Sequence, residues 1–201
     1  MLHARAVLAA FTFVVVVSGC GDSSSSEPAA PPPAKTESGT TTTTTTTTTV
    51  EALPDAGFGM QVGRTTAKAI ALLDRVAVGR HEGYDRVVFQ FATEGVPGYR
   101  VEYVDPPLKE DGSGNPVDVK GNAFVVARME PASGFDLNTG DGVLVYKGPK
   151  RLPGASIVKE VVRTGDFEAV LSWAIGLDAE VPFRVTTAES PSRLIVDFKN
   201  D

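Results

Sequence analysis

A nucleophilic triad is the first chemistry to test, because His81 and Asp85 lie close together in residues 80–85. A histidine base with an orienting carboxylate is half of such a triad. The chain contains no Gly-x-Ser-x-Gly motif, however, and no serine has an evident partner. We therefore interpret His81 as a structural or surface residue.

Metal chemistry has little support from the residue types. Residues 136–142 are similar to a calcium loop, but the Gly and Asp at its fifth and sixth places are exchanged, and Lys147 stands where the closing Glu is needed. Cys20 is the single cysteine, and His3 and His81 are the two histidines. These counts exclude a cysteine zinc site and a multi-histidine centre. The sequence predicts no metal ion and no cofactor.

Acidic residues are numerous, and paired carboxylates are the groups that glycoside hydrolases use. Residues 51–201 hold 22 acids, but most of them fall in polar loops or at outward strand positions. Solvation is the ordinary role of an acid at such a position. A hydrolase with loop carboxylates is therefore the least favoured function, and no catalytic residue is predicted.

Two groups of polar side chains are better suited to ligand binding. Strand alternation puts the first group on the outer face of adjacent strands: Arg86, Gln90, Arg100 and Glu102. The second group lies around a basic turn: Tyr146, Lys147, Lys150 and Arg151. Either group could meet carboxylates and amides of wall polymers, and each also looks like a solvated sheet face. Trp173 and Tyr103 could stack on sugars, but both share a register with apolar neighbours, which favours a core role.

Alternation of apolar and polar residues predicts the strands that position these groups. The predicted strands are 87–91, 99–103, 167–175 and 194–198, with further candidates at 72–78, 124–129, 143–146, 157–162 and 183–186. Thr164-Gly165-Asp166 predicts a hairpin turn, and residues 66–73 are the single helix-like window. Short strands separated by Gly- and Pro-rich turns predict an all-β fold, an antiparallel β-sandwich.

The 201 residues divide into four parts. Residues 1–19 have a basic start and an apolar run, as a signal peptide does, and the run ends in a lipobox-like Val17-Ser18-Gly19-Cys20. Cys20 is thus the predicted lipidation site. Residues 20–50 are rich in Ser, Thr and Pro, which predicts a disordered tether. Residues 51–71 are predicted to be a flexible lead-in, and 72–201 to be the sandwich domain.

This organisation predicts a protein at the extracytoplasmic face of the cell membrane, held there by its lipid anchor only. The net charge of the chain is −6, and residues 51–201 hold 17 basic and 22 acidic residues. An acidic domain does not offer the basic surface that nucleic-acid binding requires. Nucleic acid is therefore excluded as a predicted partner.

Several motifs in order resemble the AMIN-like domain of bacterial lipoproteins. They are LDRVAVGRHEGYDRVVFQF, PGYRVEYVDPP, GPKRLPG, VVRTGDFEAVLSWAIGLDAEVPFRV and SPSRLIVDF, and they cover residues 72–198. That domain looks like a relative of the AMIN domain, a β-sandwich appended to cell-wall amidases and outer-membrane secretins. The resemblance implies a non-catalytic domain that binds peptidoglycan. Its loops at 105–121, 131–142 and 147–156 are longer than in a plain AMIN domain, so no binding residue is transferred.

The preferred interpretation is a lipoprotein whose β-sandwich binds peptidoglycan or another cell-wall glycan. The first alternative is a protein-interaction scaffold that holds an envelope enzyme or complex in place. The second is the carboxylate-dependent hydrolase. The polar groups around Arg86 and Lys150 are the predicted binding residues in the preferred case.

Overall fold

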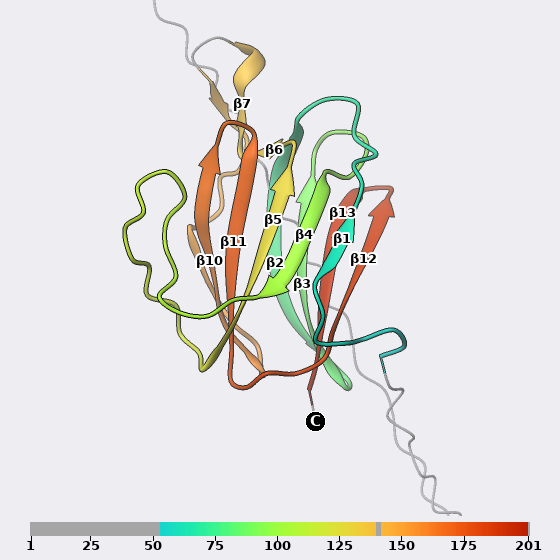
Figure 1. Cartoon of the computed structure of the whole chain (residues 1–201). Coiled ribbons are helices and arrows are strands. Elements are labelled where there is room, and N and C mark those ends of the chain that lie inside the picture. Colours follow the sequence, from blue (N-terminus) through green and yellow to red (C-terminus); the bar gives the residue numbers. More distant parts are fainter. Residues whose placement is uncertain (1–52, 140–141, 201) are drawn as a thin grey trace, which may run out of the picture. The chain divides into compact units, whose positions relative to one another are not determined.

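The computed structural model describes residues 53–139 and 142–200, whose regular secondary structure consists almost entirely of strands (Figure 1). One sheet has the order β1-β4-β5-β11-β10-β9, with bounds Gln61–Gly63 (β1), Gly98–Tyr103 (β4), Ala123–Glu130 (β5), Val170–Leu177 (β11), Val158–Phe167 (β10) and Arg151–Pro153 (β9). The other has the order β12-β13-β3-β2-β6, with bounds Phe183–Glu189 (β12), Ser192–Lys199 (β13), Tyr84–Phe91 (β3), Ala71–His81 (β2) and Ala132–Ser133 (β6). We call them the first and second sheet.

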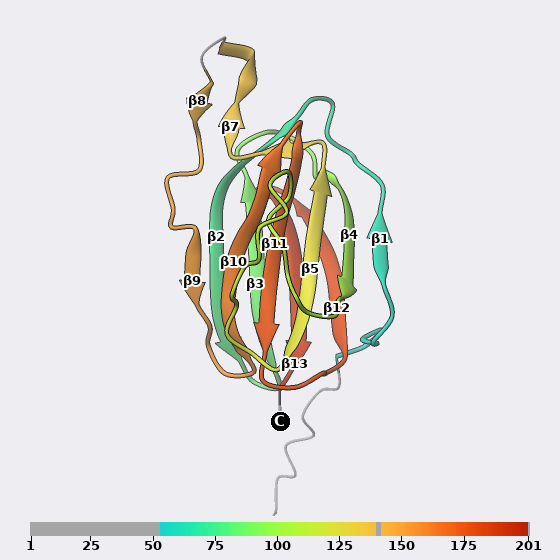
Figure 2. The ribbon, with the colours of Figure 1, turned by 60° about the vertical axis from the view of Figure 1, so that its left-hand side comes forward.

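A small hairpin extends from one end of the two sheets. It consists of β7 (Phe135–Asp136) and β8 (Val143–Leu144), with the 3-10 helix η1 (Leu137–Thr139) after β7. Figure 2 shows it beyond the ends of β10 and β11. In both sheets the strand pairs are antiparallel, apart from the short pair β2–β6. The predicted all-β, antiparallel fold is confirmed.

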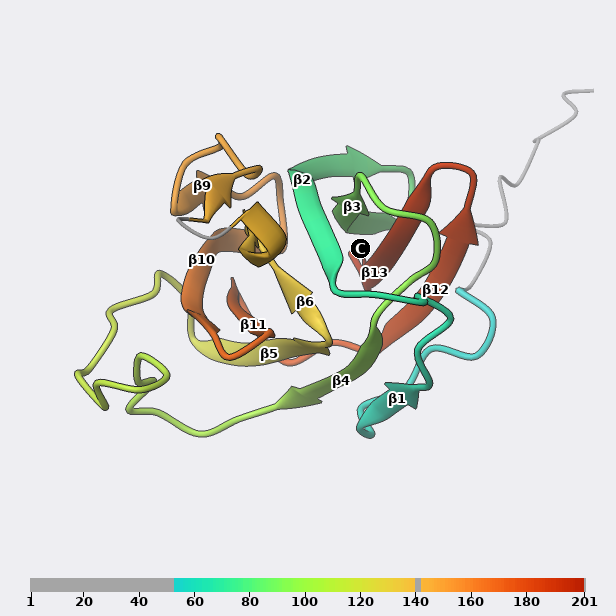
Figure 3. The same ribbon diagram turned by 90° about the horizontal axis from the view of Figure 1, so that it is seen from above.

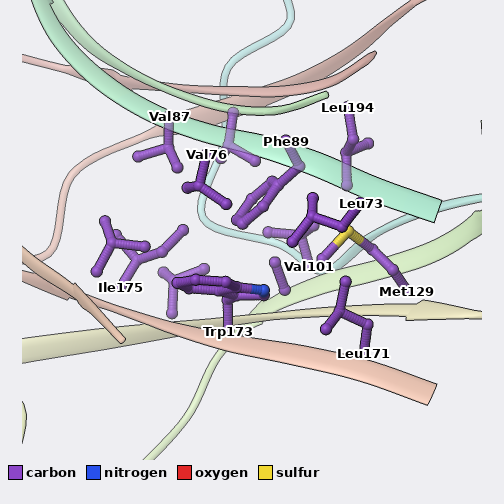
Figure 4. Packing of buried hydrophobic residues seen from close by; sticks show 14 of the residues in the cluster. Leu73, Val76, Val87, Phe89, Val101, Met129, Leu171, Trp173, Ile175 and Leu194 are labelled. Carbon is purple, nitrogen blue, oxygen red and sulfur yellow. The ribbon is translucent and has the colours of Figure 1, made fainter. Parts of the chain in front are cut away.

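The core lies between the two sheets, which face each other when seen from above (Figure 3). Alternating residues of β3 and β11 point into it, so Val87 and Phe89 meet Trp173 and Ile175, and all four are fully buried. The rings of Phe89 and Trp173 have centroids 5.9 Å apart (Figure 4). The predicted core role of Trp173 is thus correct, because its side chain fills the middle of the sandwich.

The connection between β4 and β5, residues 104–122, covers the outer face of the first sheet. A Cβ added at Gly176 would overlap the carbonyl oxygen of Lys120, and one at Gly165 would overlap the side chain of Asp111. Figure 2 shows this connection crossing in front of β10 and β11. As a result, β11 is buried on both faces and includes the small residues Ser172 and Ala174 on its outer side. We call residues 104–122 the strap.

The predicted hairpin turn is in the wrong place. β10 continues through Thr164-Gly165-Asp166 to Phe167, with a register shift between Arg163 and Gly165, and the chain turns at Glu168-Ala169. Both turn residues have positive φ, 50° and 60°. A two-residue hairpin turn requires such angles, which Asn, Asp and Gly usually supply. Glu-Ala carries no such signal, whereas the Gly-Asp pair in the strand does.

The segment before β2 also differs from the prediction. The flexible lead-in contains β1 and a bridge between Gly57 and Phe183, and the helix-like window has no helix, because β2 starts at Ala71. The side-chain amide of Gln61 donates to the Phe183 carbonyl (2.8 Å) and its oxygen accepts from the Val185 amide (2.8 Å). One polar side chain thus orders a segment that has no apolar alternation to indicate a strand.

The predicted signal peptide, Cys20 and the tether lie outside the described residues. Within the described part of the chain, no helix has the length and apolarity needed to cross a membrane.

Candidate functional site

The first predicted polar group does not form one surface. Arg86 and Gln90 lie on β3 in the second sheet, whereas Arg100 and Glu102 lie on β4 in the first sheet. Alternation along each strand does show which residues point outward. It does not show that the chain changes sheet between β3 and β4, so the prediction that these strands are adjacent is wrong.

Arg86 belongs to a charged cluster on the second sheet. Its Nε and Nη2 donate to the carboxylate of Asp197 at 2.7 and 3.0 Å, and Nη2 of Arg184 donates to the same carboxylate at 2.8 Å. Burial acts to raise the pKa of Asp197, but the hydrogen bonds from both arginines outweigh it and lower that pKa. The same hydrogen bond raises the pKa of Arg86.

The other members of the first group make exposed contacts. Gln90 donates to Asp74 at 3.3 Å, and Arg100 forms an ion pair with Glu102 at 2.7 Å. The Arg100 side chain is more than half exposed, so this pair contributes little to stability.

One residue of the second predicted group, Lys150, borders a cavity, and the other three lie outside its lining. Tyr146 is buried, with its hydroxyl donating to the Pro149 carbonyl (2.9 Å) and its ring against Trp173, so it is not a surface residue. Its basic neighbours in the sequence favour a surface position, which the structure contradicts. Lys147 is exposed beside it. Burial raises the pKa of the Tyr146 phenol.

Lys150 and Arg151 attach this turn to the rest of the fold. Nζ of Lys150 donates to Glu110 of the strap at 2.6 Å. Arg151 donates to the Asp118 carbonyl (2.8 Å) and to Glu160 (3.1 Å). The contact with Lys150 lowers the pKa of Glu110. Arg151 therefore has a structural role, while Lys150 borders a cleft.

The cleft has a volume of about 600 Å³ and lies between the strap, β7 and the end of β10. It combines charged groups with two aromatic rings, and its lining residues are Glu110, Asp111, Gly112, Ser113, Phe135, Lys150, Arg163, Thr164, Gly165, Asp166 and Phe167. We call it the β10 cleft. Of the predicted residues, Lys150 alone lines it.

Arg163 is the most distinctive residue of the β10 cleft. Its side chain is 23% exposed, and Nη1 is buried with no hydrogen-bond partner in the described residues. The nearest carboxylate oxygen, of Asp166, is 3.6 Å away, which is beyond hydrogen-bond distance. Asp166 accepts instead from the Ser133 hydroxyl (2.8 Å) and the Gly134 amide (3.0 Å). The charge of Arg163 is thus paired with Asp166, while its Nη1 has no hydrogen-bond acceptor in the described residues.

Phe167 gives the cleft an exposed aromatic wall. It is the last residue of β10 and is 62% exposed, because the Glu168-Ala169 turn pairs it with Val170 rather than placing it in the core. Phe135 lies across the cleft and is half-buried. An exposed ring beside charged and polar side chains suits a ligand that has both an apolar face and hydrogen-bonding groups.

Other predicted features have structural explanations. His81 is exposed and stacks on Tyr84 with ring centroids 4.8 Å apart. The hydroxyl of Tyr103 donates to the Val181 carbonyl (2.7 Å) and accepts from its amide (2.9 Å), while the ring packs on the core. Among residues 53–139 and 142–200, no group of three or more His, Cys, Asp or Glu side chains could hold a metal ion.

Comparison with known proteins identifies the class of this fold. The family model of the AMIN-like domain matches residues 71–200, which include both sheets except β1. The chain belongs to the AMIN-like domain family. No curated protein and no solved structure shows significant similarity to it.

Proposed function

We propose that this chain is a non-catalytic cell-wall binding protein and that its β10 cleft binds peptidoglycan or another wall glycan. In this proposal lipid on Cys20 holds the protein at the extracytoplasmic face of the membrane, and residues 20–50 give the domain reach. Membership of the AMIN-like family supports a wall-associated role. The cleft supports a glycan as the ligand.

The observation that carries the proposal is an exposed aromatic ring, that of Phe167, and the guanidinium of Arg163 in the lining of one cleft. The C–H face of a sugar ring packs on an aromatic side chain such as Phe167. Sugar hydroxyls and acetamido oxygens accept hydrogen bonds, and the partly exposed Arg163 side chain in the lining of the cleft is a donor for them. Asp111 lines the same cleft, and its carboxylate accepts no hydrogen bond from the described residues, so it can take a hydroxyl donor.

The test is co-sedimentation of the purified full-length protein with insoluble peptidoglycan, with and without its attached wall polymers. We expect wild-type protein to pellet at moderate salt and Phe167→Ala to pellet about tenfold less, since truncating a central aromatic contact costs roughly 1–2 kcal/mol. Arg163→Gln should weaken pelleting similarly. Phe58→Ala is the matched control, because Phe58 is also exposed, at 56%, but lies away from the cleft.

Two results would contradict the proposal. Wild-type protein that stays in the supernatant with both wall preparations rules out wall-glycan binding. Equal pelleting of Phe167→Ala and Phe58→Ala leaves wall binding intact but removes the β10 cleft as its site. Thermal unfolding of each variant confirms that the fold is retained.

A further inference from the structure

A second surface, on the opposite sheet, has a regular arrangement of charge. The register of β2, β3, β13 and β12 aligns their outward residues in four rows across the sheet. From one end these rows are His81, Tyr84 and Lys199; Gly79, Arg86, Asp197 and Arg184; Ala77, Val88, Ile195 and Thr186; and Arg75, Gln90, Arg193 and Ala188. We call these residues the basic face.

The basic face is positive in a domain that is negative. Four arginines lie on it, Arg75, Arg86, Arg184 and Arg193, and two carboxylates accept hydrogen bonds from its residues, those of Asp197 and the adjacent Asp74. Residues 51–201 as a whole hold 17 basic and 22 acidic residues. Charge of one sign gathered on one face attracts a partner of the opposite sign. A face of this charge is suited to an anionic partner.

The middle of the basic face is apolar. The third row has Ala77, Val88 and Ile195 between two rows that contain arginines. At one end Tyr84 stacks on His81, and the guanidinium carbon of Arg86 lies 5.1 Å from the centre of the Tyr84 ring. An anion with an apolar surface of its own, such as a charged sugar chain, matches this pattern better than inorganic phosphate does.

The size of the face favours a polymer over a folded protein. Four strands span about 14 Å, and four rows along the strands span about 20 Å, or roughly 300 Å² in all. A standard protein–protein interface buries about 800 Å² on each partner. An extended chain that lies along the strands needs no larger surface than this one.

We propose that the basic face binds a carboxylate-bearing polysaccharide, with carboxylates at the two arginine-containing rows and sugar rings over the apolar row between them. Arg86 and Arg184 already hold one carboxylate, that of Asp197, from two sides. Arg75 and Arg193 flank Gln90 at the other end, where a ligand carboxylate meets two guanidinium groups. This surface is separate from the β10 cleft, so the inference does not depend on the proposed function.

The test measures binding of the purified full-length protein to polygalacturonate by calorimetry at two salt concentrations. The variant Arg75→Glu/Arg193→Glu reverses two exposed or half-exposed charges and leaves the Asp197 cluster intact. The control Arg64→Glu/Arg100→Glu makes the same change of net charge on exposed residues outside the face. We expect the face variant to lose at least about tenfold in affinity and the control to lose about twofold or less.

Polyglutamate and polyphosphate of matched charge distinguish a sugar site from a general anion site. The proposal is supported if the wild type binds polygalacturonate more tightly than polyglutamate or polyphosphate, and if the face variant and Tyr84→Ala lose this preference. Equal affinity for all three polymers, equal losses in the face and control variants, or no binding by the wild type each overturns it. Phe167→Ala should bind polygalacturonate like the wild type, so failure of this proposal and of the cleft proposal are distinguishable.

Discussion

Asp197 is the residue on which the charged row of the second sheet depends. Its side chain is fully buried, and two arginines that are 21–29% exposed donate three hydrogen bonds to it. A buried carboxylate is costly unless it is paired in this way. The pairing keeps its pKa below the ordinary value despite burial, which links this one side chain to acid stability.

Replacing Asp197 by Asn should lower the free energy of unfolding at pH 7 by about 2–3 kcal/mol. This loss is smaller than for a fully buried ion pair, because both arginines reach solvent. The pKa of Asp197 is lower in the folded than in the unfolded protein. Its ionised form therefore stabilises the fold above about pH 3.9, and this stabilisation is lost as the pH falls through the folded pKa. Urea unfolding from pH 2 to 7 should therefore show a steeper acid loss in wild type than in Asp197→Asn.

Glu110→Gln is the control for that measurement. The pKa of Glu110 is also lowered, by Lys150, but this ion pair lies at the surface, where such pairs contribute little. Its acid profile should stay close to that of wild type. Parallel acid profiles for wild type and Asp197→Asn would contradict the role given to the Asp197 cluster.

At the scale of elements, β1 joins the edges of the two sheets. It pairs with β4 of the first sheet, and the Gln61 amide reaches β12 of the second. Gln61→Ala removes two hydrogen bonds to partly buried backbone groups, each worth about 1 kcal/mol. We expect faster amide hydrogen exchange at Val185, and unchanged exchange in β11. Met60→Ala, an exposed neighbour, should change neither.

The strap makes a second prediction at this scale. Gly176 lets the strap lie directly on β11, because a Cβ there would overlap the Lys120 carbonyl. Gly176→Ala should displace the strap and lower the free energy of unfolding by about 1–3 kcal/mol. The same substitution at Gly59 meets open space and serves as the control. Equal stability of the two variants would show that the strap adapts without cost.

Strands that bury one face in the core could be predicted from the sequence, whereas elements held by a single side-chain hydrogen bond or an unusual turn could not. In β3 and β13 the core takes every second side chain, and in β11 large inward residues alternate with small outward ones because the strap covers the outer face. β1 has three residues and depends on one amide. The true turn uses Glu168-Ala169, which interrupts the predicted strand 167–175 and leaves Phe167 exposed.

The candidate site was predictable only at Lys150. The β10 cleft joins residues from the strap, β7 and β10, which are far apart in the chain. Arg163 and Asp166 lie on either side of the register shift in β10, where period-2 alternation fails. The residual signal is the charged pair Arg163 and Asp166 near the end of β10, which a strand pattern alone does not relate to a cavity.

At the scale of the whole domain, two candidate binding surfaces lie on different sheets with the core between them. The β10 cleft belongs to the first sheet, the strap and β7, and the basic face belongs to the second sheet. They share no residue. A polymer network that offers both ligands can be held at two points, and the second contact forms at the high effective concentration that the first creates.

This arrangement predicts different behaviour toward separate and joined ligands. With soluble ligands, Phe167→Ala combined with Arg75→Glu/Arg193→Glu should show the sum of the separate losses in binding free energy, because distant sites without shared partners do not couple. On intact wall, where both contacts act together, either change alone should release most of the protein in a dissociation assay. A coupling free energy above about 0.5 kcal/mol with soluble ligands would mean that the sheets transmit binding to one another, and the two surfaces would then have to be treated as one site.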